Sequence, residues 1–227
     1  MTCASQVIEF HRELNPDWQI PKDFELIFPF DNSDTWQAFE TFFNKYFNDD
    51  RKRHFLFGIN PGRFGAGITG IPFTDPKILN EIIGIDNPWV KRNELSSVFI
   101  YKMIEAMGGP GAFYHHFYIT SVCPLGFLAD GKNINYYDDK NLQNSVEPYI
   151  ISNIERQIEI GASRKEAFSI GQGKNYKYLV QLNKDRGYFN EIIALPHPRW
   201  VMQYRRKTME KYIDEYVTKL SSAVAEH

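Results

Sequence analysis

Polar and glycine residues that could contact a ligand follow four short apolar segments of the chain. Because ligands of parallel β-sheets bind where the strands end, an amide, a hydroxyl and an imidazole from these segments are expected to share one site. Four glycines between positions 62 and 70 would also let the backbone approach a ligand closely. The segments continue as Asn60-Pro-Gly-Arg-Phe-Gly65, Ser121-Val-Cys-Pro-Leu125, Gly171-Gln-Gly173 and His197-Pro-Arg-Trp200.

Other residues that could carry chemistry have weaker patterns. The pair His115-His116 would point to opposite faces of an extended segment, so a shared metal ion is not expected. Gly171-Gln-Gly173 begins like a dinucleotide-binding loop, but Tyr176 stands where that loop needs its third glycine. The two cysteines, Cys3 and Cys123, exclude a four-cysteine zinc or iron–sulfur site within one chain. We therefore expect no metal and no cofactor.

The elements that must position these residues alternate along the chain. This alternation predicts an α/β fold, a three-layer sandwich with a central parallel four-stranded sheet. We expect a single domain over residues 1–227, in which residues 1–50 form a helical N-terminal extension packed on the core. Apolar runs predict strands over residues 54–59, 117–122, 167–170 and 192–195, and apolar periodicity predicts helices over residues 34–47, 94–107, 142–160, 176–182 and 203–220.

Composition limits the partners and the compartment. The 227 residues have a net charge of -2, which argues against a polybasic nucleic-acid binder that works through bulk charge. Residues 195–211 nevertheless hold five Lys and Arg against one Glu, so a local contact face for an anionic partner is expected. The chain starts without a signal-peptide pattern and has no apolar run near 18 residues. We expect a monomer that binds no membrane and is cytoplasmic, or nucleoid-associated if bacterial.

The run from Gly58 to Phe73, Gly-Ile-Asn-Pro-Gly-Arg-Phe-Gly-Ala-Gly-Ile-Thr-Gly-Ile-Pro-Phe, carries the most specific pattern. It resembles the first motif of the single-strand-selective monofunctional uracil-DNA glycosylases, within the uracil-DNA glycosylase superfamily. The resemblance continues at residues 117–125, at 168–173 and at His197-Pro198, and it covers about residues 30–220. It indicates a divergent bacterial-type subgroup, and it implies the uracil-DNA glycosylase fold and DNA with a damaged base as the partner.

The resemblance also implies a role for each matching position. Asn60 would position the attacking water, and His197 would contact the pyrimidine carbonyl and stabilise the departing base. Because the base leaves as a delocalised anion, a hydrogen-bond donor matters more than a paired acid and base. The positions implied in base binding are Ile59, Gly62, Phe73 and Ser121, and those implied in DNA contact or as the wedge are Arg199, Trp200, Met202, Tyr204, Arg205 and Arg206.

Two positions depart from the family pattern. Ser121 stands where the family has the asparagine that reads the uracil edge, and a hydroxyl cannot make that two-point contact. We therefore expect weaker discrimination for uracil and acceptance of xanthine or hypoxanthine. The segment His197-Pro198-Arg199 also lacks a Ser-Pro pair that the family carries, which leaves the wedge open among Arg199, Trp200, Met202 and Tyr204.

The sequence thus predicts a monofunctional DNA glycosylase of base-excision repair that removes uracil and other deaminated bases. One alternative is a DNA-binding relative without catalysis, against which the retained Asn60 and His197 argue. The other is a nucleotide or small-molecule hydrolase on the same scaffold. The basic and aromatic residues 199–207 argue against it, because a small-molecule pocket has no use for a wedge.

Overall fold

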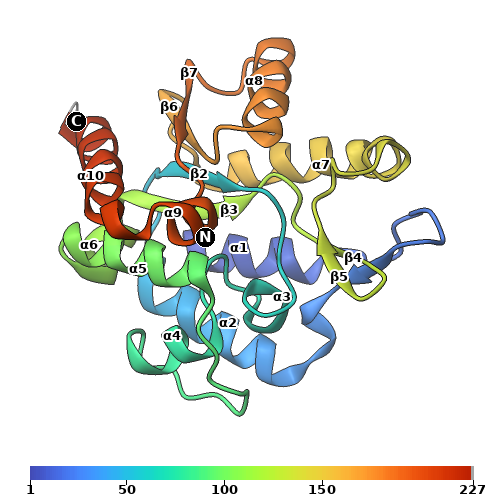
Figure 1. The fold of residues 1–227 in the computed structure, drawn as a ribbon, viewed down its shortest axis with the longest axis horizontal. Helices are drawn as coiled ribbons and strands as arrows, with labels where there is room; N and C mark the ends of the chain where they lie inside the picture. The colour runs from blue at the N-terminus through green and yellow to red at the C-terminus, as the bar shows by residue number, and fades with distance from the viewer. Residues whose placement is uncertain (226–227) are drawn as a thin grey trace.

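A four-stranded parallel sheet forms the centre of the computed structural model, which describes residues 1–225 (Figure 1). The strand order is β3-β2-β6-β7, and every neighbouring pair is parallel. The predicted central sheet is therefore confirmed, with each strand within one residue of its expected place. The strands are β2 (His54–Gly58), β3 (Phe117–Ser121), β6 (Glu166–Ile170) and β7 (Glu191–Leu195).

Helices cover both faces of this sheet and complete the three layers (Figure 1). The chain passes from β2 to β3 through α5 (Leu95–Ala106) and α6 (Gly109–His116). It then reverses direction across the sheet through α7 (Lys140–Gly161) and α8 (Lys174–Arg186). Because parallel crossovers are right-handed, this reversal puts the two pairs of helices on opposite faces.

The N-terminal segment packs on the core through two helices, α1 (Cys3–Arg12) and α2 (Ser33–Tyr46). Asn32 caps α2 by accepting backbone N–H bonds from residues 34 and 35, and the phenylalanines of one stripe are buried. The expected extension is not wholly helical, since it also contains β1 (Glu25–Ile27) and a short 3₁₀ turn, Pro29–Asp31. That residues 1–227 form one domain stays a prediction.

A second, antiparallel sheet of order β1-β4-β5 was not predicted from the sequence. Its other strands are β4 (Gly126–Ala129) and β5 (Lys132–Ile134), joined as a hairpin. Strands of three or four residues are too short to show a reliable two-residue period. The hairpin pairs with β1, about a hundred residues earlier in the chain, so only the tertiary structure reveals it.

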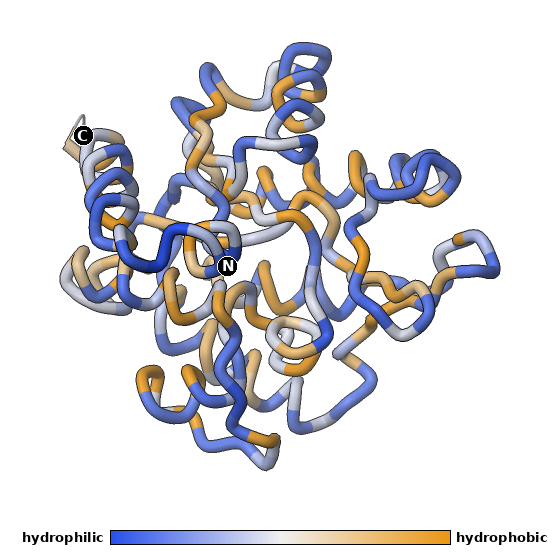
Figure 2. Tube along the Cα trace, viewed as in Figure 1, coloured by the Kyte–Doolittle hydropathy of each residue, from blue (hydrophilic) through white to orange (hydrophobic). Residues whose placement is uncertain are grey.

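The prediction of one continuous helix over residues 203–220 is wrong. The chain instead forms α9 (Pro198–Tyr204), a 3₁₀ turn (Arg206–Thr208) and α10 (Met209–Ala225). Arg205 interrupts the helix with φ -131° and ψ 19°. The connection between α9 and α10 is hydrophilic, and its cations lie on the surface (Figure 2).

One shorter prediction also changes. Gly108 is the N-cap of α6, and Pro110 stands in the first turn of this helix, where proline is tolerated. His115 and His116 therefore end a helix and do not lie on an extended segment. The loop after β2 holds α3 (Ala66–Thr69) and α4 (Pro76–Glu81), and Asp75 caps α4. Within residues 1–225, no helix has the length and apolar character needed to cross a membrane.

Candidate active site

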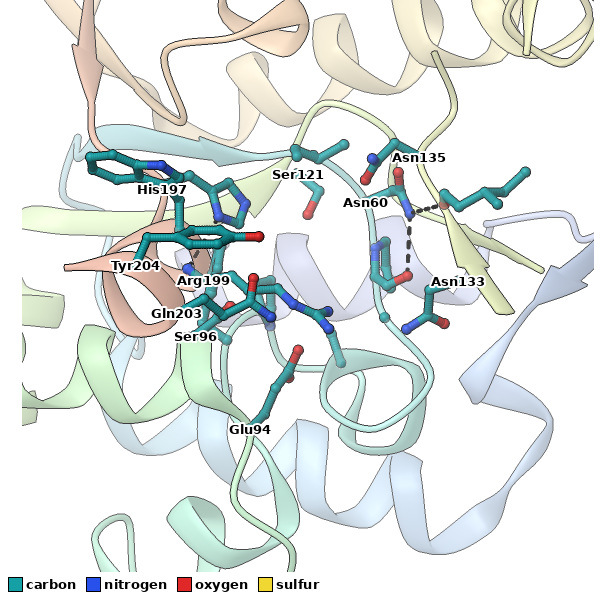
Figure 3. A pocket seen from close by; sticks show the side chains of 18 residues that line it. Asn60, Glu94, Ser96, Ser121, Asn133, Asn135, His197, Arg199, Gln203 and Tyr204 are labelled. Atoms are coloured by element: carbon teal, nitrogen blue, oxygen red, sulfur yellow. Dashed lines mark hydrogen bonds between the residues drawn. The ribbon is translucent and has the colours of Figure 1, made fainter. Parts of the chain in front are cut away.

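A pocket of about 390 Å³ lies at the carboxyl ends of β2, β3 and β7. Asn60 enters it from the loop after β2, Ser121 from the end of β3, and His197 from the start of α9. Figure 3 shows Asn60 and His197 on opposite sides of the pocket, with Ser121 between them. Three of the four strand ends singled out in the sequence thus meet in one place, as the topology requires.

Hydrogen bonds hold the Asn60 side chain in one orientation. Its Nδ2 donates to the backbone oxygens of Pro61 and Ile134, each at 3.3 Å, and its Oδ1 accepts the N–H of Tyr136 at 3.2 Å. A carbonyl oxygen has two lone pairs, so Oδ1 can still accept a bond from a water molecule. The segment that follows β5 therefore orients the amide.

The His197 ring is oriented by the helix that it caps. Its Nδ1 accepts the backbone N–H of Arg199 at 3.2 Å, so in the neutral ring the proton is on Nε2. Burial, followed by the nearby charge of Arg199, lowers the pKa of His197 to about 4. The ring at neutral pH is therefore an uncharged imidazole whose Nε2–H can donate a hydrogen bond.

Gly171 supports the His197 ring from the end of β6. Its φ is +129°, and a Cβ added there would lie 3.3 Å from Cδ2 of the imidazole. Any side chain would thus meet both an unfavourable backbone conformation and the ring. The fourth strand end does not line the pocket, but it fixes how closely the imidazole packs.

Phe73 lies in the pocket wall in a left-handed backbone conformation, with φ +54°. Only a small fraction of non-glycine residues adopt such a φ, and those that do gather at functional sites. Its ring packs against Gly58, where an added Cβ would lie 3.0 Å from Cε2 of the ring. The glycine at the end of β2 therefore makes room for the aromatic wall of the pocket.

The remaining predicted residues divide into three groups. Ile59, Gly62 and Ser121 line the pocket with Arg199, Trp200 and Tyr204, whereas Arg205 and Arg206 are exposed beside it. Met202 is only 5% exposed and belongs to the core, so it cannot enter DNA without unpacking α9.

The two aromatic residues of α9 differ in how firmly they are held. Trp200 packs edge-on against Tyr212 with ring centres 5.7 Å apart, and the Arg205 guanidinium lies 5.1 Å over its ring. Tyr204 is 66% exposed, and within residues 1–225 its ring packs against no other aromatic ring. Tyr204 is therefore the less constrained of the two side chains, and its ring lies at the pocket on the same side as His197 (Figure 3).

Several polar residues of the pocket wall were not predicted from the sequence. Asn133 and Asn135 come from the unpredicted β5 and its exit, and Glu94 and Ser96 come from the start of α5 (Figure 3). Asp75 places Glu94 there, because its Oδ2 accepts the Glu94 backbone N–H at 2.9 Å while its Oδ1 caps α4. No periodicity marks these positions, and only their proximity to the motif loops brings them into the site.

In the part of the chain that the structure describes, no group of three or more acidic, histidine or cysteine side chains could hold a metal ion.

Comparison with known proteins decides the family. A model of the uracil DNA glycosylase superfamily matches residues 44–221. This chain belongs to the uracil DNA glycosylase superfamily. This chain is similar to SMUG2 from Pedobacter heparinus, whose crystal structure superposes on it with a TM-score of 0.95. The two sequences are 43% identical, and the match includes 99% of each chain.

Curated relatives extend the similarity within the superfamily. The single-strand selective monofunctional uracil DNA glycosylases of Mus musculus and Rattus norvegicus are each 26% identical, over 135 and 139 residues. These matches include 51% and 53% of this chain but only 47% and 49% of the relatives, about half their length. The predicted fold of this superfamily is confirmed, with its central parallel sheet and helices on both faces.

Proposed function

We propose that this protein is a monofunctional DNA glycosylase that hydrolyses the N-glycosidic bond of uracil and other deaminated bases in DNA. The observation that carries the proposal is the pairing, across one pocket, of a neutral imidazole donor with an oriented asparagine amide. Members of this superfamily are typically DNA glycosylases. The superfamily suggests the substrate class, and these two groups supply the chemistry that the proposed reaction needs.

The proposed reaction breaks the bond between the base and a sugar that develops oxocarbenium character. The Nε2–H of His197 donates to the base carbonyl, where negative charge accumulates as the bond breaks. Such a donor is typically worth about 3 kcal/mol to the transition state. The oxygen of Asn60 orients a water molecule, whose oxygen bonds to the sugar carbon as the bond to the base breaks. The base leaves as its anion, and the proton released from the water passes to bulk solvent. Strong basicity is unnecessary, because the cationic sugar is highly reactive.

A hydrolytic reaction without strand cleavage is supported by the composition of the pocket. Glycosylases that also cleave the strand use an amine to form a Schiff base with the sugar. Among residues 1–225, those lining the pocket include no lysine. Water is therefore the nucleophile that we propose, and the product is an abasic site in an intact strand.

The identity of the excised base depends on Ser121. Ser121 is 8% exposed at the end of β3, and its hydroxyl donates and accepts hydrogen bonds through a single oxygen atom. We infer that uracil, xanthine and hypoxanthine are all accepted, since no side chain at this position imposes a two-point pyrimidine contact. Phe73 supplies the surface on which the flipped base stacks, a contact worth roughly 1 to 3 kcal/mol.

Tyr204 is the wedge that we propose for the space left by the flipped base. It is the most exposed of the aromatic candidates, and Arg205 and Arg206 follow it directly, where they can contact phosphates. Trp200 is held by neighbouring side chains, and Met202 is buried.

Oligonucleotides that contain uracil, hypoxanthine or xanthine test the proposal. The protein should generate alkali-labile sites, and Asn60→Ala should lower the excision rate at least 100-fold by loss of the water ligand. Because Asn60 also holds the segment after β5, the melting temperature and DNA affinity of the variant must be measured alongside. DNA binding without excision by the wild-type protein would instead indicate an inert relative, and neither activity would favour a small-molecule hydrolase.

A further inference from the structure

A second, smaller pocket of about 230 Å³ adjoins the candidate active site. We call it the side pocket. It shares Glu94, Ser96, Asn133 and Arg199 with the main pocket, so the two are continuous. Its other walls come from the loop after β2, from the segment before α5 and from the first residue of α5, and they include Phe64, Arg92 and Leu95. The proposed reaction uses none of these last three residues.

Phe64 has no evident structural reason to be on the surface. Its side chain is 44% exposed and does not belong to the hydrophobic core. The guanidinium of Arg63 lies 4.5 Å from its ring centre and so covers one face of the ring. An exposed aromatic ring beside cations is the arrangement on which bases of single-stranded nucleic acid stack.

The loop that carries Phe64 is held before any ligand arrives. The backbone N–H groups of Gly65 and Gly67 both donate to the Gly62 oxygen, at 3.2 and 2.9 Å. The backbone N–H of Arg63 donates to Oδ1 of Asn133 at 3.2 Å. Ordering the loop therefore adds little to the cost of binding, and the ring is available as a fixed surface.

The charges of the side pocket favour a phosphate. Arg92 and Arg199 face it with one acidic residue, Glu94. Burial, followed by the nearby charge of Asp75, raises the pKa of Glu94 above its ordinary value. The side pocket thus combines an aromatic surface with a positive balance of charge.

We propose that the side pocket binds the nucleotide next to the damaged one on the same strand, with its base on Phe64 and its phosphate near Arg92 and Arg199. This inference rests on the proposed glycosylase function, because it assumes that a flipped base occupies the main pocket. Recognition is by stacking, and every base has a flat face, so the site tolerates any sequence.

The test combines two changes. One removes the neighbouring base from the DNA, and the other removes the Phe64 ring from the protein. Single strands carry a hydrolysis-resistant deoxyuridine analogue and, on one side or the other, a spacer without a base. For the wild-type protein, one of the two spacers should weaken binding about 5- to 100-fold, as expected for one stacked base. Phe64→Ala should weaken binding of the complete strand equally, and the spacer should then have no further effect.

Two variants make the result specific. Phe64→Trp should keep the sensitivity to the spacer, because it keeps an aromatic surface. Val90→Ala removes an apolar side chain that is 71% exposed outside the side pocket, and it should bind like the wild-type protein. If the spacers weaken binding equally in wild-type protein and Phe64→Ala, or weaken neither, the inference is wrong.

Failure of the inference is distinguishable from failure of the proposed function. Excision of uracil with no coupling between Phe64 and the neighbouring base would refute the side pocket and leave the glycosylase proposal intact. Absence of excision from every deaminated base would refute the glycosylase proposal, whatever the binding data show.

Discussion

His197 combines two functions in one side chain, because it caps α9 and also faces the pocket. The capping bond occupies Nδ1 and so leaves the proton on Nε2, where the proposed reaction needs a donor. An imidazolium would be a stronger donor but would have to be buried beside Arg199, which burial and like charge both oppose. A neutral ring therefore suits this environment.

The protonation of His197 can be measured directly. With its pKa lowered to about 4, the ring should stay neutral, with the Nε2–H tautomer, throughout the range above about pH 5. Nitrogen-15 NMR titration should find a midpoint near 4, and Arg199→Ala should raise it because a repelling charge is removed. A midpoint near that of an exposed histidine, or a proton on Nδ1, would contradict this assignment.

Substitution of the single residue Ser121 tests how the base is selected. Ser121→Asn should raise the preference for uracil over hypoxanthine about tenfold, since an amide adds a two-point contact with the pyrimidine edge. Excision rates on matched oligonucleotides give the ratio. Ser121→Ala is the control, because it removes the hydroxyl without adding an amide and should leave the preference relaxed. Equal ratios in wild type and Ser121→Asn would show that other residues select the base.

At the scale of elements, loops far apart in the chain orient the two catalytic candidates. Asn60 is held by the exit of β5, 74 positions away at Ile134, and the His197 ring rests on the turn after β6. The bond to Ile134 uses Nδ2 of Asn60, and the contact of Gly171 is with Cδ2 of His197, so these two contacts leave Oδ1 and Nε2 available. Both restrict a side chain that would otherwise sample several rotamers, and misplacement by about 1 Å can cost 100-fold in rate.

The turn after β6 offers a matched pair of variants. Gly171→Ala should lower the excision rate about 10- to 100-fold, because its Cβ would crowd the His197 ring and its φ of +129° disfavours a side chain. Gly173→Ala, two residues later, should be nearly neutral, since its Cβ would meet no atom within 4 Å. Excision rates and the His197 NMR signals report both effects. Equal losses in the two variants would mean that the turn acts only through stability.

At the scale of the whole molecule, an acidic protein presents a local basic face to its proposed substrate. The net charge is -2, yet Arg199, Arg205 and Arg206 cluster around the start and end of α9. Affinity for DNA should therefore depend on a few phosphate contacts and on stacking, and not on bulk charge.

The dependence of DNA affinity on salt concentration measures how many phosphate contacts form. With about three phosphates neutralised, log K for a single strand should fall with log salt at a slope of about -2. Arg206→Gln should make the slope shallower by about 0.7, because one released counterion is lost. Lys184→Gln, an exposed cation on α8, should not change it. A slope equally sensitive to Lys184 would show that the basic face at α9 is not the contact surface.

Much of the fold and part of the site could be predicted from local sequence. Each strand of the central sheet is a short apolar run bounded by turn residues, and alternation with helices implies parallel pairing. Asn60, Ser121 and His197 then had to meet, because carboxyl ends of parallel strands share an edge. The short β4–β5 hairpin, the break at Arg205 and the polar wall from Glu94 to Asn135 could not be predicted, since no local period marks them.

By itself, the sequence determined which groups are available for chemistry and the edge of the sheet where they gather. Only the tertiary structure decided their state: the tautomer of His197, the orientation of the Asn60 amide, and the exposure of Tyr204 against the burial of Met202. The physical reason is distance along the chain. A motif specifies atoms within a few residues, whereas orientation and burial depend on neighbours many positions away, brought close only by folding.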